Sequence, residues 1–225
     1  VQAAGYQTYY ENGLKPQGST NVTRNVYLTP LPESASFQSV WMENLEYPGV
    51  WRIRPSENWD YLAVAMGKHP DAWDVPCSTN VYLFRSTGER LWSYPVGDQV
   101  WGIDINREGT LVAAGSHDRT LYVIDRSGNL AWSENIGTLL REVRLSNTSA
   151  YLGAETVPIK TFNATTGAVI WEYNPGVDAW WRGITFSPDD RHVIYGGGNS
   201  LILLDMENGT PTWHEYVANV PYDIK

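Results

Sequence analysis

Phe162-Asn-Ala-Thr-Thr-Gly-Ala-Val-Ile-Trp171 is the stretch that decides how the rest of the chain is interpreted. It has the pattern of a strand end, a tight turn through Gly167, and a second strand with a Trp four residues after the glycine. The same spacing recurs where Gly88 leads to Trp92, Gly128 to Trp132, and Gly209 to Trp213. A degraded fifth copy, Asn25-Val-Tyr-Leu28 followed by Val40-Trp41, lies near the beginning. Short strands and glycine turns repeated about every 40 residues are typical of β-propeller blades.

Three of these copies share a longer pattern, Asp-x-x-x-Gly-x-x-x-Trp. It is complete at Asp205-Gly209-Trp213, has Asn for Asp at Asn163-Gly167-Trp171, and has a turn one residue shorter at Asp125-Gly128-Trp132. The pattern resembles the tryptophan-docking repeat of quinoprotein-like (PQQ-type, WD40-like) β-propellers, and the repeat covers nearly the whole chain. The resemblance implies an all-β propeller of four-stranded blades. It implies no single function, because enzymes, assembly scaffolds and surface adhesins share this repeat.

The number of blades follows from the first strand of each repeat. Equivalent first-strand positions are Trp51, Trp101, Arg141, Arg182 and Tyr222, so there are five first strands but only four complete units. Pairing the terminal strands would leave no open sheet edge. We therefore predict one domain, 1–225, with five blades at 50–98, 99–138, 139–178, 179–219, and 220–225 joined with 6–45. The alternative is part of a seven- or eight-bladed ring.

The repeated tryptophans are predicted to be structural. A Trp at a fixed place in each blade can pack between neighbouring sheets and donate its N–H to a backbone carbonyl. This prediction covers Trp41, Trp92, Trp132, Trp171 and Trp213.

A second group of residues is predicted to form a binding face. The segments leading into the first strands and the loops joining the second and third strands share one face of a propeller, and loops on a rigid scaffold often carry binding sites. Aromatic and Arg side chains there can stack on sugars or hold anionic groups. The candidates are Trp51, Trp73, Trp101, His117, Asp118, Arg141, Trp180, Trp181 and Arg182. The alternative is that they only fill the mouth of the central channel.

One repeat is about ten residues longer than the others, between its second and third strands. The extra segment, Lys68–Cys77, places Trp73 between Asp71 and Asp74. A loop of this kind can act as a specificity lid over the face, or as a rigid cover bounded by prolines.

Composition narrows the function classes. The net charge is −9 and the isoelectric point about 4.9, so no basic stripe for nucleic acid is expected. No apolar run approaches the ~20 residues of a membrane helix, and nothing resembles a signal peptide, so the expectation is a mature or trimmed soluble chain. Cys77 is the only cysteine, which excludes an intrachain disulfide.

Four sequons could accept N-linked glycans, at Asn21, Asn147, Asn163 and Asn208. Together with the acidic composition and the high Trp and Tyr content, they favour an extracellular or cell-surface glycoprotein.

No catalytic motif is found, and no cofactor or metal site is predicted. A PQQ dehydrogenase would need a vicinal cysteine pair, which a single cysteine cannot provide. The predicted function is a non-catalytic propeller that binds a glycan or a protein partner at the cell surface. The alternatives are a self-assembling subunit of a surface layer or filament, and a glycosidase-like enzyme using carboxylates among Asp71, Asp74, Asp104 and Asp118.

Overall fold

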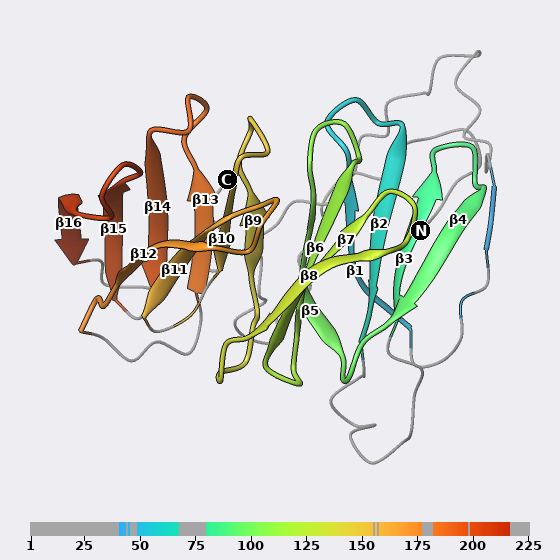
Figure 1. Ribbon diagram of the computed structural model, residues 1–225, viewed down its shortest axis with the longest axis horizontal. Coiled ribbons are helices and arrows are strands. Elements are labelled where there is room, and N and C mark those ends of the chain that lie inside the picture. Colours follow the sequence, from blue (N-terminus) through green and yellow to red (C-terminus); the bar gives the residue numbers. More distant parts are fainter. Residues whose placement is uncertain are drawn as a thin grey trace, which may run out of the picture. The chain divides into compact units, whose positions relative to one another are not determined.

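Four antiparallel sheets of four strands each make up the described part of the chain (Figure 1). The computed structural model describes residues 41–43, 45, 49–67, 80–154, 156, 158–176, 182–197 and 199–216, all within the unit Trp41–Lys225. The strands are β1 (Val50–Pro55), β2 (Tyr61–Met66), β3 (Asn80–Arg85), β4 (Arg90–Pro95), β5 (Val100–Ile105), β6 (Leu111–Ser116), β7 (Thr120–Asp125), β8 (Leu130–Asn135), β9 (Val143–Leu145), β10 (Tyr151–Ala154), β11 (Ile159–Asn163), β12 (Val169–Tyr173), β13 (Arg182–Phe186), β14 (His192–Gly197), β15 (Ser200–Asp205) and β16 (Pro211–Tyr216).

Each sheet is a simple meander in which consecutive strands pair, as the alternating sequence pattern predicts. The first strands of successive sheets contact one another, β1 with β5, β5 with β9, and β9 with β13. This is the arrangement of successive propeller blades, and it confirms the predicted fold class for the described sheets. The predicted fifth blade, 220–225 joined with 6–45, lies almost wholly outside the described residues, and five blades stays a prediction.

The first strand of the third sheet is shorter than predicted. The sequence predicts a strand over 140–145, but β9 contains three residues and its pairing with β10 ends at Val143. Leu140 is instead fully buried, and its Cβ lies 2.7 Å from where a Cβ on Gly115 would be. Packing of Leu140 against the neighbouring sheet therefore replaces strand pairing at this point.

The core lies between neighbouring sheets. One cluster joins strands β2 and β3 to β5 and β6 through Ala63, Leu83, Ile103 and Val112, and similar clusters join the next two pairs of sheets. Many of these side chains are completely buried, because a sheet in the middle of a blade stack is covered on both faces. Burial of this kind, at about 25 cal/mol per Å² of apolar surface, is the main force that holds blades together.

Four of the five predicted structural tryptophans each contact a turn of a neighbouring sheet, whereas Trp213 is 44% exposed. Trp171 on β12 is 8% exposed, and its Nε1–H donates to the carbonyl of Met206 at 2.9 Å in the turn between β15 and β16. The indole covers Gly209, where an added Cβ would lie 2.6 Å from the ring and where φ is +70°. Only glycine fits such a turn without strain. The same pair of contacts occurs for Trp41 with Ser86 and Gly88, Trp92 with Arg126 and Gly128, and Trp132 with Ala164 and Gly167.

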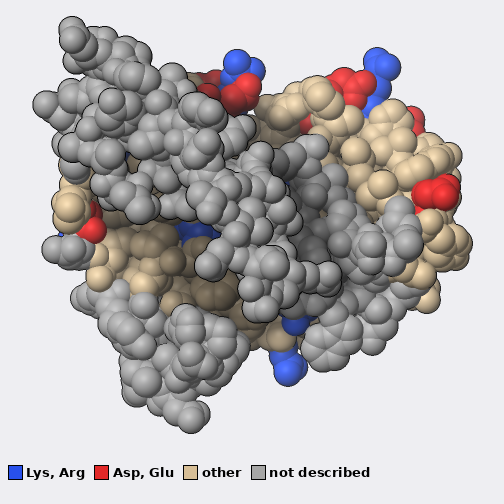
Figure 2. Space-filling model, turned by 180° about the vertical axis from the view of Figure 1, so that it is seen from behind, with Lys and Arg blue, Asp and Glu red and all other residues tan. Residues whose placement is uncertain are grey.

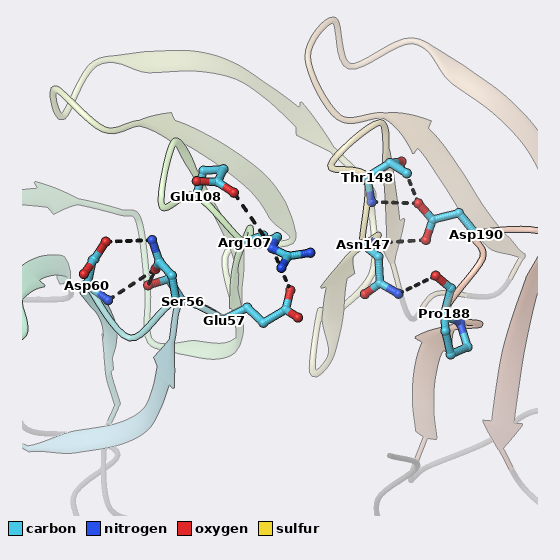
Figure 3. A network of polar contacts seen from close by, with 10 residues as sticks. Ser56, Glu57, Asp60, Arg107, Glu108, Asn147, Thr148, Pro188 and Asp190 are labelled. Carbon is cyan, nitrogen blue, oxygen red and sulfur yellow. Dashed lines mark hydrogen bonds and ion pairs between the residues drawn. The ribbon is translucent and has the colours of Figure 1, made fainter.

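Antiparallel order gives each blade two ends. The segments that enter β1, β5 and β9 lie at one end together with the β6–β7 turn, and we call this end the first-strand face. The turns between first and second strands lie at the opposite end, where they also link the blades (Figure 3).

On this opposite end, polar side chains fasten neighbouring turns. The buried carboxylate of Asp190, in the β13–β14 turn, accepts hydrogen bonds from the backbone N–H groups of Asn147 and Thr148 at 2.9 and 2.8 Å, and from the Thr148 hydroxyl at 2.6 Å. Arg107, in the β5–β6 turn, lies 3.5 Å from Glu57 in the β1–β2 turn (Figure 3). We call the hydrogen bonds from Asn147 and Thr148 to Asp190 the Asp190 latch. Because the Asp190 latch is buried and the Arg107–Glu57 ion pair is exposed, the latch contributes more to the free energy of unfolding.

Candidate functional site

Four of the predicted face residues meet in one stack on the first-strand face. The ring of Trp51, at the start of β1, stacks on that of Trp101, at the start of β5, with centroids 5.5 Å apart and an interplanar angle of 14°. His117, in the β6–β7 turn, lies 3.9 Å from the Trp101 ring, and the guanidinium carbon of Arg141 lies 5.7 Å from it. We call these four residues the aromatic stack. Three blades contribute to it, so it forms only when the blades are packed side by side.

The aromatic stack presents one open ring to solvent. Trp51 is 41% exposed, and its neighbours on the same edge strand, Val50 and Ile53, are 47% and 51% exposed. Trp101, His117 and Arg141 are only partly exposed. The exposed part of the site is therefore an apolar strip along β1 that ends in a stacked Trp.

His117 is held as a neutral ring. The amide nitrogen of Gln99 lies 3.1 Å from its Nδ1. Burial lowers the pKa of His117 below its usual 6.5, the carboxylate of Asp98 raises it, and the nearby charge of Arg141 lowers it. At neutral pH the cation of the aromatic stack is therefore Arg141.

Beside the aromatic stack lies a cluster of charged residues, which we call the arginine cluster. Glu142 is buried and forms ion pairs with Arg52, with Arg54 at 3.6 Å, and with Arg144 at 2.8 Å. The contact passes over Gly102 in β5, where an added Cβ would lie 3.1 Å from the backbone of Glu142. A glycine at that point lets the segment before β9 approach β5 closely. Arg52 and Arg54 on β1 can then reach Glu142 in that segment.

Asp104 in β5 belongs to the same cluster. Its carboxylate accepts a hydrogen bond from the backbone N–H of Leu145 at 2.8 Å. Burial raises the pKa of this carboxyl, while the charge of Arg144 and the hydrogen bond of Leu145 lower it. Burial also lowers the pKa of Arg54, with Arg144 acting in the same direction. The arginine cluster thus holds three guanidinium groups against two carboxyl groups, which makes it locally basic in a protein of net charge −9.

Asp118, also predicted for the face, is used inside its own blade. Its carboxylate accepts hydrogen bonds from the backbone N–H groups of Gly97 and Thr120 at 2.9 and 2.8 Å, and from the Tyr122 hydroxyl at 2.6 Å. These bonds fix the β6–β7 turn that carries His117. In this arrangement Asp118 positions the turn beside the aromatic stack, and its role in ligand binding stays a prediction.

The side chains of the remaining predicted face residues lie outside the described part of the chain. Trp73, Trp180 and Trp181 lie outside the described residues, as do Asp71 and Asp74 of the long loop. Arg182 begins β13, where its backbone pairs with Gly197. Of the predicted set, the structure therefore brings together Trp51, Trp101, His117 and Arg141.

Sequence reasoning missed the charged half of the site. Arg54, Glu142 and Arg144 were not predicted as face residues, although Arg52 and Arg54 alternate along β1, and the run Arg141-Glu-Val-Arg144 places charges at β9, the first strand of the third sheet. Arg side chains in an inner strand, where apolar residues are expected, were the signal that could have revealed the arginine cluster.

Asn147 and Asn208 lie in turns, and Asn163 is the last residue of β11, directly before a turn. Asn163 and Asn208 accept hydrogen bonds from backbone N–H groups of their own turns, and the Asn147 side-chain nitrogen donates to the Pro188 carbonyl at 2.9 Å. Asn21 lies outside the described residues. Glycosylation of the four sequons stays a prediction.

A cavity of about 460 Å³ lies on the opposite face. It is bounded by the beginning of β10, the β13–β14 turn and the β15–β16 turn, with Tyr151, Asp190, Arg191, His192, Asp205, Met206 and Glu207 as its lining. Asp190 and Met206 are already used to fasten blades, as latch and as acceptor for Trp171. The cavity is therefore a gap beside a blade-to-blade contact.

Three further features of the described residues concern charge, metal ligands and helices. In Figure 2, acidic and basic side chains of the described residues are interspersed, and that view shows no broad basic area for nucleic acid. Within the described segments there is no group of three His, Cys, Asp or Glu residues arranged to hold a metal ion. Nor does any of these segments form a helix long and apolar enough to span a membrane.

Comparison with known proteins adds two similarities. No protein-family model matches the chain. The chain is 23% identical over 198 residues to the outer membrane protein assembly factor BamB of Burkholderia pseudomallei (strain K96243), an alignment that covers 84% of this chain and 49% of that protein. The crystal structure of BamB from Moraxella catarrhalis superposes with a TM-score of 0.59 at 20% identity, covering 73% of this chain and 48% of that one. The chain spans about half the length of the proteins it matches.

These similarities show the fold. The repeated Trp–turn contacts, the four-stranded sheets and the structural match identify a PQQ-type β-propeller repeat protein. The prediction that the chain is not an enzyme agrees with a relative named as an assembly factor.

Proposed function

We propose that this chain is a non-catalytic β-propeller of the bacterial cell envelope that binds a protein partner during outer membrane protein assembly. The likeness to an outer membrane protein assembly factor supports the cellular role. The aromatic stack and the arginine cluster, side by side on the first-strand face, support the mode of binding.

The geometry of the aromatic stack favours a protein over a glycan. A sugar ring stacks on an open aromatic face, but Trp101 is already covered by Trp51, His117 and Arg141. Only Trp51 is exposed, and it lies in a strip with Val50 and Ile53 that runs along the edge strand β1. An apolar strip with one Trp anchor suits the side chains of a protein segment better than the hydroxyl groups of a glycan.

The arginine cluster supplies the polar part of such an interface. Arg52 and Arg54 keep 29% and 28% of their side chains exposed, while the carboxylate of Glu142 is buried between them. The partly exposed side chains of Arg52 and Arg54 can therefore pair with carboxylates of a partner, and Trp and Arg are the residues that most often dominate protein interfaces. The fitting partner segment is apolar with an acidic residue at one end.

Site-specific photo-crosslinking in bacterial cells that have an outer membrane tests this proposal. A photoreactive residue at position 51 is expected to yield adducts with outer membrane proteins or with proteins of their assembly machinery. Position 59 is the matched control, because Trp59 is 66% exposed but lies in the β1–β2 turn on the opposite face. Equal adducts from both positions, or none from position 51, would contradict the proposed interface.

A glycan array and sedimentation separate the remaining alternatives. Glycan binding that is lost in Trp51→Ala would replace the protein partner with a lectin function. Concentration-dependent self-assembly that is lost in the same variant would favour a structural subunit.

A further inference from the structure

The arginine cluster holds more positive than negative charge. Among the described residues, Glu142 supplies the only carboxylate within ion-pair distance of its three guanidinium groups. Asp104 is the second carboxyl of the cluster, and burial raises its pKa more than the charge of Arg144 and the hydrogen bond of Leu145 lower it. Three guanidinium groups less one or two carboxylates leave a net charge between +1 and +2.

Glu142 does not satisfy all the donors that surround it. Arg52 donates a hydrogen bond to its Oε2 atom. Nη1 of Arg144 lies 2.8 Å from Oε1 of Glu142, but the two groups are not aligned for a hydrogen bond. Nη2 of Arg54 is 3.6 Å from the same oxygen, which is longer than a hydrogen bond. Arg54 and Arg144 are therefore held near Glu142 by charge rather than by hydrogen bonds.

Arg54 shows most directly what the cluster lacks. Its Nε atom is buried and has no hydrogen-bond acceptor among the described residues. Burial and the charge of Arg144 lower the pKa of Arg54, and the charge of Glu142 opposes them without offsetting them. Buried polar groups in proteins are nearly always hydrogen-bonded. An anionic acceptor from outside the chain would satisfy both the donor and the charge.

The arginine cluster is accessible to a small anion. The side chains of Arg52 and Arg54 on β1 are 29% and 28% exposed, and that of Arg144 on β9 is 14% exposed. The three guanidinium groups converge on Glu142 from two strands that both contact β5. Partial burial strengthens their attraction for an anion, because the effective dielectric constant there is below that of water.

We propose that the arginine cluster binds a phosphate group. The oxygen atoms of a phosphate accept hydrogen bonds from several directions, and guanidinium groups bind them in pairs. A phosphate monoester carries a charge of about −1.5 to −2 at pH 7, which matches the excess positive charge of the cluster. The group can belong to free phosphate or to a lipid headgroup. The inference goes beyond the proposed function, because phosphate would bind without a protein partner and would compete with a partner's acidic residue for Arg54.

Titration calorimetry of the 225-residue chain with inorganic phosphate, at constant ionic strength, tests the site. One phosphate should bind per chain, and chloride should not replace it. In nitrogen-15 NMR spectra, the Nε–H resonance of Arg54 should shift along the same saturation curve. Absence of both the heat and the shift, or binding no stronger than that of chloride, would overturn the proposal.

Three variants locate the binding. Arg54→Lys keeps the charge and removes the Nε donor, so phosphate should bind about tenfold more weakly, as expected for one lost hydrogen bond to a charged group. Glu142→Gln removes a competing negative charge and should strengthen binding severalfold. The control Arg107→Gln changes an exposed arginine at the opposite end and should bind like the parent.

Unchanged affinity in Arg54→Lys would place the phosphate elsewhere and would contradict the proposal. If circular dichroism shows that Glu142→Gln is unfolded, Arg54→Lys and the NMR shift of the parent still decide.

Lipid vesicles distinguish the two sources of phosphate. The probe is co-sedimentation with phosphatidylcholine vesicles that do or do not contain phosphatidic acid. Binding only to the vesicles with phosphatidic acid, reversed by inorganic phosphate and lost in Arg54→Lys, would assign the site to a lipid headgroup. Calorimetric binding without vesicle binding would assign it to free phosphate, and either result supports a phosphate site. Both measurements use the chain without a partner, so their failure would leave the crosslinking test of the proposed function unaffected.

Discussion

Replacing Trp171 with alanine tests the force that joins the blades. A buried Trp removes about 150–250 Å² from water, and alanine would restore only a small part of that burial. At about 25 cal/mol per Å², the lost burial amounts to about 3–4 kcal/mol, because Trp171 is only 8% exposed. Loss of the Nε1–H donor leaves the Met206 carbonyl unpaired, which costs about 1 kcal/mol more. Trp171→Ala should therefore lower the free energy of unfolding by about 4–5 kcal/mol.

The assay is urea unfolding followed by far-ultraviolet circular dichroism, with two matched variants. Trp171→Phe keeps most of the ring but not the donor, and should cost about 1–2 kcal/mol. Trp213→Ala removes the equivalent side chain where it is 44% exposed, and should cost less than half as much as Trp171→Ala. Equal losses for Trp171→Ala and Trp213→Ala would refute the argument, because the effect would then not come from burial against the next blade.

Three further predictions concern the turn at Gly209, the buried hydrogen bonds of Asp190 and the titration of His117. Gly209→Ala should lower the free energy of unfolding by about 2–4 kcal/mol, because it combines backbone strain with overlap of the Trp171 ring. The control Gly137→Ala, at φ +80° with nothing within 4 Å of an added Cβ, should cost only about 1–2 kcal/mol. Urea unfolding compares the two variants. Asp190→Ala should lower the free energy of unfolding by about 2–3 kcal/mol in the same assay, because three hydrogen-bond donors lose their acceptor. A loss no larger than that of an exposed ion pair would contradict the stabilising role of the Asp190 latch. Because the pKa of His117 is lowered in the folded protein, its stabilising contribution is complete above the unfolded value of about 6.5 and is lost as the pH falls below it. Melting temperatures from pH 8 to 5 should therefore fall less steeply for His117→Gln than for the parent chain.

The sequence predicted the repeated part of the fold well, because a repeat gives the same information several times. Glycine turns, alternating strands and a Trp at constant spacing located all four described sheets, and strand ends differed by a few residues. The failure at β9 has a local cause. Leu140 has the apolar character of a strand residue, but its side chain packs above Gly115 in the preceding sheet. Pairing rules within one sheet cannot predict that contact.

The candidate site was only half predicted, for a related reason. Trp51, Trp101 and Arg141 occupy equivalent positions in the repeat, so their convergence followed from symmetry, and His117 from the position of its turn. Glu142 has no equivalent that repeats, and its contact with Arg52 skips one blade. That contact depends on Gly102 leaving room for a neighbouring backbone, a feature that no periodic pattern marks.

The two kinds of contact indicate how this fold separates stability from binding. The docking tryptophans recur from blade to blade, and the Asp190 latch lies at the end opposite the first-strand face. Both join neighbouring blades, through apolar burial and through hydrogen bonds to the backbone. The aromatic stack and the arginine cluster depart from the repeat and bring together residues from three blades at the first-strand face. Substitutions at Trp51 or Arg52 leave the Trp–turn contacts in place, because neither residue takes part in one, but they remove the contacts with Trp101 and Glu142. Under the proposed function, specificity for the partner resides where the repeat is broken, at the non-repeating charges around Glu142.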